Sequence, residues 1–190
     1  MAARERIIDA SVELVRERSF AELTVGEIMD RAGLERTIFY RHFENVGQML
    51  LAAGRAAIDQ LFAAQVSLAE TRRHADRESV REALALPVAV YRRHGPILRA
   101  ISEAVAADQL MAADGEAIRL RFDSLVAGAL REAGSPVADA DETAHALNLL
   151  NESYLLDAFG REPRVSPEVA VETLTAIWSP LLGAGPEGSE

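Results

Sequence analysis

Four polar residues share one side of a short helix that the sequence predicts from about Glu35 onward. Their spacing of one, three and four positions brings them together on a helical surface. Arginine can bond guanine with both arms of its guanidinium group in the major groove of DNA, and hydroxyl groups can hold backbone phosphates. These residue types predict a surface that binds double-stranded DNA. The four residues are Arg36, Thr37, Tyr40 and Arg41.

The residues before and within this helix indicate how it would be positioned. Thr24 can cap a helix over residues 25–32. Gly33 can take the left-handed conformation that ends a helix without steric cost. Phe39 and Phe43 lie four positions apart and would face inward, opposite the polar side. This order of elements is typical of a helix-turn-helix.

Spacing alone leaves a plainer interpretation open, because a glycine can end any helix and a polar face can be solvated surface. The motif Tyr-Arg-His-Phe at residues 40–43 adds a more specific signal. Together with an amphipathic helix over residues 7–15, it resembles the DNA-binding domain of the TetR (tetracycline repressor) family. The resemblance implies a transcriptional regulator with six DNA-contacting residues. These are Thr24, Arg36, Thr37, Tyr40, Arg41 and His42.

Three residues depart from the pattern of that family. Glu35 stands where a serine commonly caps the recognition helix, and it would put a negative charge near phosphates. Ile38 and Val46 stand where the family often has a hydroxyl group and a lysine that contact phosphates. Each lost phosphate contact lowers the salt dependence of binding by about one unit of slope. The alternative hypothesis is therefore a helical dimer that binds a ligand or a protein and has weak or lost DNA binding.

Composition and patterning predict an all-α protein. Hydrophobic residues make up 49% of the 190, and no run of alternating β-branched residues indicates a strand. We expect about nine helices, divided between a three-helix DNA-binding head (residues 1–45) and a larger ligand-binding and dimerisation body (residues 46–190). The body helices are expected over residues 46–69, 79–93, 96–106, 114–133, 139–159 and 167–182.

Two prolines and a glycine are the reason why we expect two helices, and not one, over residues 79–106. Pro87 should bend or interrupt the first helix, because its ring removes one helical hydrogen bond. Gly95 and Pro96 should end that helix and start the next, since proline is tolerated at the first helical position. The polar segment over residues 70–78 is expected to form a loop before them.

The net charge of −10 speaks against a nucleic-acid partner, but the distribution of charge matters more than its sum. Residues 61–190 hold twelve arginines against twenty acidic residues, so most of the acidic excess lies in the body. Around the predicted recognition helix, three arginines face a single acidic residue, Glu35. We therefore expect a locally positive surface. The three arginines are Arg31, Arg36 and Arg41.

The sequence gives no sign of catalytic or metal chemistry. The chain has no cysteine, and its four histidines lack the spacing of metal ligands. No nucleophile elbow or phosphate-binding loop accompanies them, so we expect no metal, no cofactor and no enzymatic activity. Charges interrupt every apolar run before the about 18 residues of a membrane span, and no secretory leader opens the sequence. These features predict a cytoplasmic protein without membrane insertion.

Two asparagines could contact a ligand. Asn148 and Asn151 lie three positions apart on one face of the predicted helix over residues 139–159, among leucines. Buried there without a partner, an amide would cost about 1–3 kcal/mol. In a structural interpretation each amide bonds a neighbouring helix or a buried water. In a functional one the amides line an apolar pocket and orient the carbonyl or amide group of a ligand.

Residues 145–178 are also similar to the C-terminal helices of a TetR-family repressor with a long apolar ligand tunnel. This resemblance implies that Asn148, Asn151 and Trp178 line such a tunnel and that the ligand is an apolar small molecule. Four further wall candidates follow only from apolar or aromatic character at helical spacing, for which core packing is the simpler explanation. They are Tyr91, Phe122, Leu125 and Leu147.

A homodimer follows from the DNA hypothesis, because one short recognition helix needs a second copy to span two half-sites. Dimers of the TetR family pack their two C-terminal helices as a four-helix bundle, where Trp178 could equally serve as an anchor. The sequence as a whole predicts a homodimeric repressor that an apolar ligand releases from a near-palindromic operator. The apolar residues expected at the dimer interface are Leu149, Leu156, Val169, Leu174 and Ile177.

Overall fold

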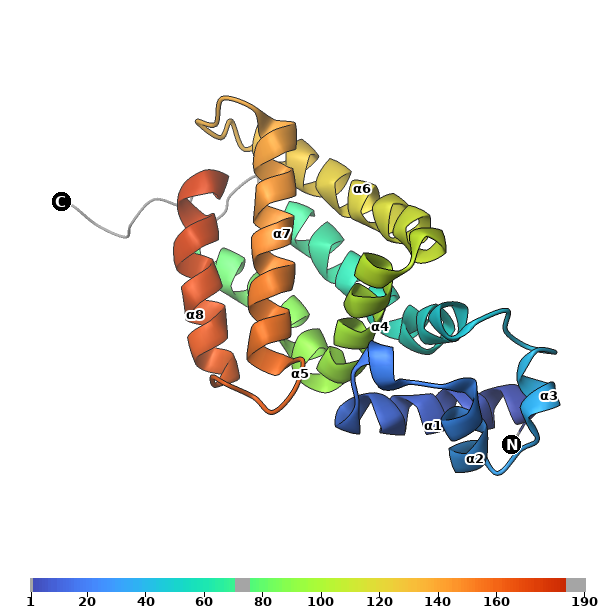
Figure 1. The fold of residues 1–190 in the computed structure, drawn as a ribbon. Coiled ribbons are helices and arrows are strands. Elements are labelled where there is room, and N and C mark those ends of the chain that lie inside the picture. Colours follow the sequence, from blue (N-terminus) through green and yellow to red (C-terminus); the bar gives the residue numbers. More distant parts are fainter. Residues whose placement is uncertain (1, 71–75, 184–190) are drawn as a thin grey trace.

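The computed structural model describes residues 2–70 and 76–183, and every regular element in these residues is helical, which confirms the all-α class. The elements in chain order are α1 (Ala3–Glu17), η1 (Phe20–Glu22), α2 (Val25–Ala32), α3 (Arg36–Phe39), α4 (Val46–Glu70), α5 (Arg77–Ala107), α6 (Gln109–Glu132), α7 (Ala140–Phe159), α8 (Pro167–Trp178) and η3 (Ser179–Leu182). In Figure 1 the helices α1 to α3 form a small head, α5 to α8 form the body, and α4 leads from one to the other. None of the helices in the described ranges combines the length and apolar character needed to cross a membrane.

The turn between α2 and α3 forms as the sequence predicts. Thr24 caps α2, since its Oγ1 accepts the backbone N–H of Glu27 at 3.2 Å. Gly33 ends α2 with a φ of 63°, in the left-handed region that favours glycine. A contact from α1 adds to these signals, because the Arg6 guanidinium donates to the carbonyl oxygens of Ala32 at 2.6 Å and Gly33 at 3.1 Å. The end of α2 is thereby bonded to α1.

One long helix, α5, replaces two expected helices, so the predicted break at Gly95 and Pro96 is wrong. Pro87 and Pro96 both lie inside α5, each at a cost of about 3 kcal/mol. The helix packs against α4, α6, α7 and α8, and each large apolar side chain that it buries returns about 1.5–3 kcal/mol. Gly95 serves packing, because a Cβ there would lie 2.0 Å from the carbonyl oxygen of Phe159. The described residues therefore contain eight α-helices where about nine were expected.

The last two helices begin within one residue of the predicted positions, and a capping residue precedes each. Asp139 accepts two backbone N–H groups in the first turn of α7, and Ser166 accepts one in the first turn of α8. The helix α6 begins before the expected residue 114, and η3 forms the last turn of the expected final helix. Most of the loop expected over residues 70–78 lies outside the described residues, and α5 already begins at Arg77.

Two hydrophobic cores share α5. The body core surrounds Trp178, which is fully buried. The head core contains Phe39 and Phe43 together with Ile101 of α5. The long helix thus packs against the head as well as the body. The division into two domains after residue 45 stays a prediction.

The buried side chain of Arg99 joins three parts of the chain. From α5 it donates to the carbonyl oxygen of Gly160, directly after α7, at 3.0 Å. It also donates to the carbonyl oxygens of Val15 and Arg18, at the end of α1, at 3.0 and 3.1 Å. Glu103, one turn further along α5, forms an ion pair with it. This arginine therefore fixes the head, α5 and the end of α7 in one arrangement.

Replacing Arg99 by methionine should lower the free energy of unfolding by about 2–4 kcal/mol, because it leaves Glu103 without its cation and three carbonyl groups without a donor. Urea unfolding followed by circular dichroism measures the change. Arg92→Met is the matched control, since Arg92 is an exposed arginine of the same helix. The control should change stability by less than about 0.5 kcal/mol. Equal stabilities of the two variants would contradict this role of Arg99.

Candidate nucleic-acid interface and internal cavity

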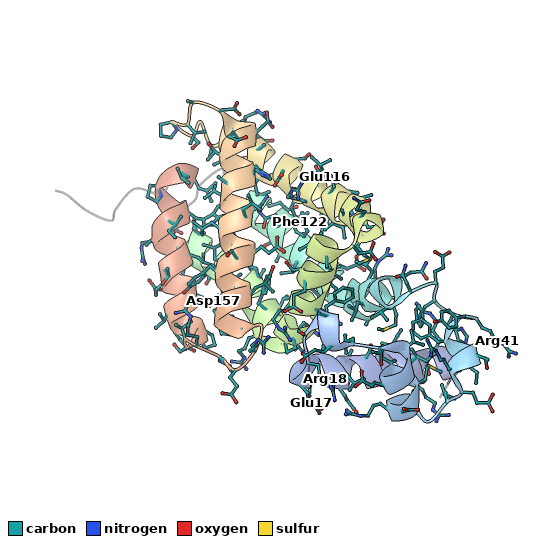
Figure 2. All side chains as sticks on the ribbon, viewed as in Figure 1. Glu17, Arg18, Arg41, Glu116, Phe122 and Asp157 are labelled. Carbon is teal, nitrogen blue, oxygen red and sulfur yellow. The ribbon has the colours of Figure 1, made fainter. Side chains whose placement is uncertain are left out.

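The side chains predicted to contact DNA lie on the outside of the head. Behind them Phe39 and Phe43 are only 0% and 4% exposed, with ring centroids 5.6 Å apart, so the aromatic residues hold α3 from the inside as expected. Figure 2 shows Arg41 at the end of the head that is remote from the body. Thr24 is also exposed, at the start of α2. The exposed residues in and directly after α3 are Arg36, Thr37, Tyr40, Arg41 and His42.

Arg31 does not add to the positive charge of this surface. Its guanidinium nitrogens lie 3.4 Å from the carboxylates of Glu13 and Glu17 in α1. The expected grouping of Arg31 with Arg36 and Arg41 is therefore wrong, because a neighbouring helix neutralises it. Within residues 2–70 and 76–183, Arg36 and Arg41 form no ion pair. Their full charge is available to a phosphate or a base.

The three departures from the TetR pattern have different surroundings. Glu35 is the N-cap residue of α3 but makes no side-chain capping bond, and it is exposed beside the positive residues. Ile38 and Val46 are partly buried and pack against the head core. These two residues therefore stabilise the head, whereas Glu35 contributes a charge at the candidate interface.

A cavity of about 170 Å³ lies in the body between α4, α5, α6 and α7. Most of its wall is apolar and includes Leu61 of α4, Leu98 of α5 and Leu155 of α7. Its volume is below the about 300–1,000 Å³ of ordinary small-molecule pockets, so only a small ligand fits without expansion. Four of the predicted ligand-binding residues line it. They are Tyr91, Phe122, Asn148 and Asn151.

Three other predicted residues lie away from the cavity wall. Leu147 and Trp178 are buried in the body core, and Leu125 is partly buried on α6. Their predicted contact with a ligand stays a prediction. Trp178 reaches the wall indirectly, because its indole Nε1–H donates to Oδ1 of Asn151 at 3.1 Å.

In each of the two asparagines, one end of the side-chain amide forms a hydrogen bond with another residue of the protein. Nδ2 of Asn148 donates to one oxygen of Asp123 at 2.8 Å, and the other oxygen of that carboxylate lies 2.9 Å from Nδ1 of His145. Oδ1 of Asn151 accepts the bond from Trp178. An acceptor oxygen on Asn148 and a donor N–H on Asn151 are left over at the wall. The structural interpretation therefore holds for one end of each amide, and a ligand contact by the other end stays a prediction.

Four polar residues of the wall were not predicted from the sequence: the neutral Gln65 and Ser102 and the charged Arg119 and Glu152. Gln65 is buried on α4, four positions after Leu61, so the helical spacing could have revealed it. Tyr91 adds a phenol group on the same wall. Burial raises the pKa of Tyr91 well above its usual value, and the carboxylate of Glu152 raises it further. The phenol therefore stays neutral and can donate a hydrogen bond.

The residues predicted at the dimer interface differ in how exposed their side chains are. Leu149 and Val169 are 46% and 53% exposed, and Leu150, which was not predicted, is 40% exposed. Leu149 also lines the cavity. Leu174 is fully buried in the body core, which leaves no surface for a partner. The partly buried residues are Leu156 and Ile177.

Two family models match the chain. Residues 7–53 match the model described as bacterial regulatory proteins of the tetR family. Residues 80–181 match the C-terminal domain of the transcriptional regulator EthR, which is more than half of the chain. The first match covers the candidate nucleic-acid interface, and the second covers most of the cavity wall.

Individual proteins that resemble this chain are also transcriptional regulators. The HTH-type transcriptional regulator EthR of Mycobacterium tuberculosis strain H37Rv is 29% identical over 183 residues, covering 92% of this chain and 85% of the relative. EthR of Mycolicibacterium smegmatis is 26% identical over 194 residues, covering 98% and 89%. The crystal structure of the TetR-family regulator PfmR from Thermus thermophilus superimposes with a TM-score of 0.72 at 17% identity, covering 94% and 97%. The last comparison concerns the fold alone.

Replacing Asp123 by alanine should lower the free energy of unfolding by about 1–3 kcal/mol, because Asn148 and His145 lose their shared acceptor. Asp157→Ala is the control, since Asp157 pairs with Arg164 where both side chains are at least half exposed. That exposed pair should contribute less than about 1 kcal/mol. Urea unfolding of both variants measures the difference. A larger loss for Asp157→Ala would contradict the structural role of Asp123.

Proposed function

Because this chain belongs to the TetR family of transcriptional regulators, we propose that it is a repressor that a small, largely apolar ligand releases from its operator. The observation that carries the proposal is the course of α4. Met49 and Leu50, near its start, are fully buried in the head core, whereas Ile58 and Leu61 line the cavity. One rigid helix thus connects the ligand cavity with the DNA-binding head.

The head is proposed to insert α3 into the major groove. Arg36 would contact a base, while Thr37 and Tyr40 would hold the helix at phosphates or bases. Regulators of this family bind operators as dimers, and two copies of so short a helix must meet half-sites about 34–36 Å apart. A protein with this role works beside the chromosome, in the cytoplasm.

The dimer is proposed to form through α7 and α8. Their outer faces carry the exposed side chains of Leu149, Leu150 and Val169. Burial of these side chains against a second copy would remove apolar surface from water, at about 25 cal/mol per Å². Such a dimer would place two heads on one face of a duplex.

The ligand is proposed to be a small molecule with apolar ends and one amide-like group. The acceptor oxygen of Asn148 and the donor N–H of Asn151 match the N–H and C=O of an amide. Apolar residues such as Leu98 and Leu155 would surround the rest of the molecule. The limited volume favours a ligand of few atoms, or one that enlarges the cavity on binding.

Ligand binding is proposed to move the head in two ways. A ligand that displaces Ile58 and Leu61 would shift α4 directly. A ligand that bonds Asn148 and Asn151 would pull on α7, whose end is bonded to Arg99 and through it to the end of α1. A differential affinity of about 1–3 kcal/mol between the two head arrangements is enough for regulation.

The second candidate function is a ligand- or protein-binding dimer that has lost DNA binding. Glu35 favours it, because its uncapped carboxylate lies among the predicted DNA contacts. Ile38 and Val46 supply no phosphate contact, since both pack against the head core. The two candidates differ in how binding to a duplex depends on salt and on sequence.

Arg36→Ala should weaken binding to the duplex directly upstream of the protein's own gene by more than about 10-fold, because the proposed dimer would lose two base contacts of about 1–3 kcal/mol each. Fluorescence anisotropy at several salt concentrations measures the affinity. Arg55→Ala is the control, because Arg55 is an exposed arginine of α4 that pairs with Asp59 at 3.5 Å. The control should bind like the parent. Equal binding of the parent to a shuffled duplex would favour the second candidate.

N-alkyl amides of increasing chain length should change the emission of Trp178, the only tryptophan, because its indole N–H is bonded to a wall amide. Affinity should rise with each added CH₂ by about 0.8 kcal/mol until the cavity is full, and then fall. Asn151→Ala should remove both the emission change and the tight binding. Fluorescence titration measures both quantities. An affinity without any dependence on chain length would argue against the cavity as the binding site.

A further inference from the structure

Arg4, in the first turn of α1, is a cation that lies close to the recognition helix but far from it in sequence. Its side chain is exposed, and its guanidinium carbon lies 5.4 Å from the centroid of the Phe43 ring. Phe43 follows Arg41 and His42 directly, and the ring centroids of His42 and Phe43 are 6.4 Å apart. Arg4 therefore borders the surface that α3 presents to DNA.

The position of Arg4 is fixed by the head core. Phe43 is 4% exposed and packs against Phe39, so the ring below the guanidinium group cannot move freely. A cation over an aromatic face gains about 0.5–1 kcal/mol at an exposed site. The neighbouring carboxylate of Glu5 is occupied, because it accepts the backbone N–H of Ala2 at 3.0 Å. Arg4 has no ion pair within the described part of the chain.

Most other arginines in or directly after α1 and α2 are committed to partners. Arg6 donates to carbonyl oxygens at the end of α2, Arg18 lies 3.0 Å from Glu27, and Arg31 pairs with two glutamates. Arg16 is exposed and unpaired like Arg4, but twelve residues of helix place it about 18 Å away, toward the body. Figure 2 shows its neighbours Glu17 and Arg18 at the end of α1 opposite Arg41.

We propose that Arg4 binds a backbone phosphate of the operator next to the groove that receives α3. The proposal rests on the proposed function, since it requires α3 to lie in the major groove. A guanidinium group matches two phosphate oxygens in geometry and charge. A phosphate contact adds affinity and orientation without sequence preference. Arg4 thereby offsets the repulsion between Glu35 and the duplex.

The test compares Arg4→Gln, Arg4→Lys and Arg16→Gln with the parent protein. Anisotropy titrations over a range of salt concentrations use the duplex upstream of the protein's own gene and a shuffled duplex of equal length. Arg4→Gln should weaken binding to both duplexes by the same factor, about tenfold at low salt for two protomers. It should also lower the salt slope by about 0.9 per protomer. Arg4→Lys keeps the charge, so its affinity for both duplexes and its salt slope should stay close to those of the parent protein.

Arg16→Gln removes the same charge from the same helix and should leave the slope within experimental error. Equal losses in Arg4→Gln and Arg16→Gln would overturn the proposal, because long-range charge would then explain both. A loss confined to the upstream duplex would also overturn it, since a phosphate contact has no sequence preference. If the parent protein binds neither duplex at low salt, the proposed function fails, and the role of Arg4 fails with it. Binding by the parent with no change in Arg4→Gln would overturn the role of Arg4 alone.

Discussion

One buried guanidinium group decides how the parts of this regulator are held together. Arg99 extends from the middle of α5, and its planar group bonds carbonyl oxygens at the ends of α1 and α7 at the same time. Glu103 balances the charge and accepts the backbone N–H of Phe20 at 2.7 Å. Because a buried charge without partners is strongly unfavourable, these helix ends cannot separate without a large cost. A displacement at the end of α7 would therefore strain the bonds that the same side chain makes at the end of α1.

The elements that were predicted correctly are those whose structure is decided by nearest neighbours along the chain. A threonine before a helix and a glycine after it have the same effect in any fold, so α2 begins and ends as predicted. The predicted range of 167–182 likewise gives the start of α8. The prediction failed at α5, because the cost of a proline is local, whereas the burial that outweighs it comes from five other α-helices. Gly95 was misjudged because a glycine that admits a neighbouring backbone looks the same in sequence as one that ends a helix.

In the candidate sites, too, contacts between helices could not be predicted from the sequence. Asn148 and Asn151 attracted notice because polar residues among leucines must have partners. Those partners, Asp123 and Trp178, come from other helices, and no pattern in the sequence could pair them. Arg31 was assigned to the positive surface on sequence distance alone, yet the packing of α2 on α1 brings it to two glutamates. Exposure and helix face are thus predictable from periodicity, whereas pairing depends on tertiary structure.

A net charge of −10 is compatible with DNA binding because salt limits the range of each charge. At physiological ionic strength the screening length is about 8 Å, and Arg41 lies at the end of the head remote from the acidic body. The body therefore does little to repel a duplex that the head has engaged, while it disfavours contact through any other face. Glu35 lies within screening distance of the predicted contacts, since it begins the same helix. Its repulsion lowers the affinity for every duplex equally, so operator binding must depend more strongly on base contacts such as those proposed for Arg36.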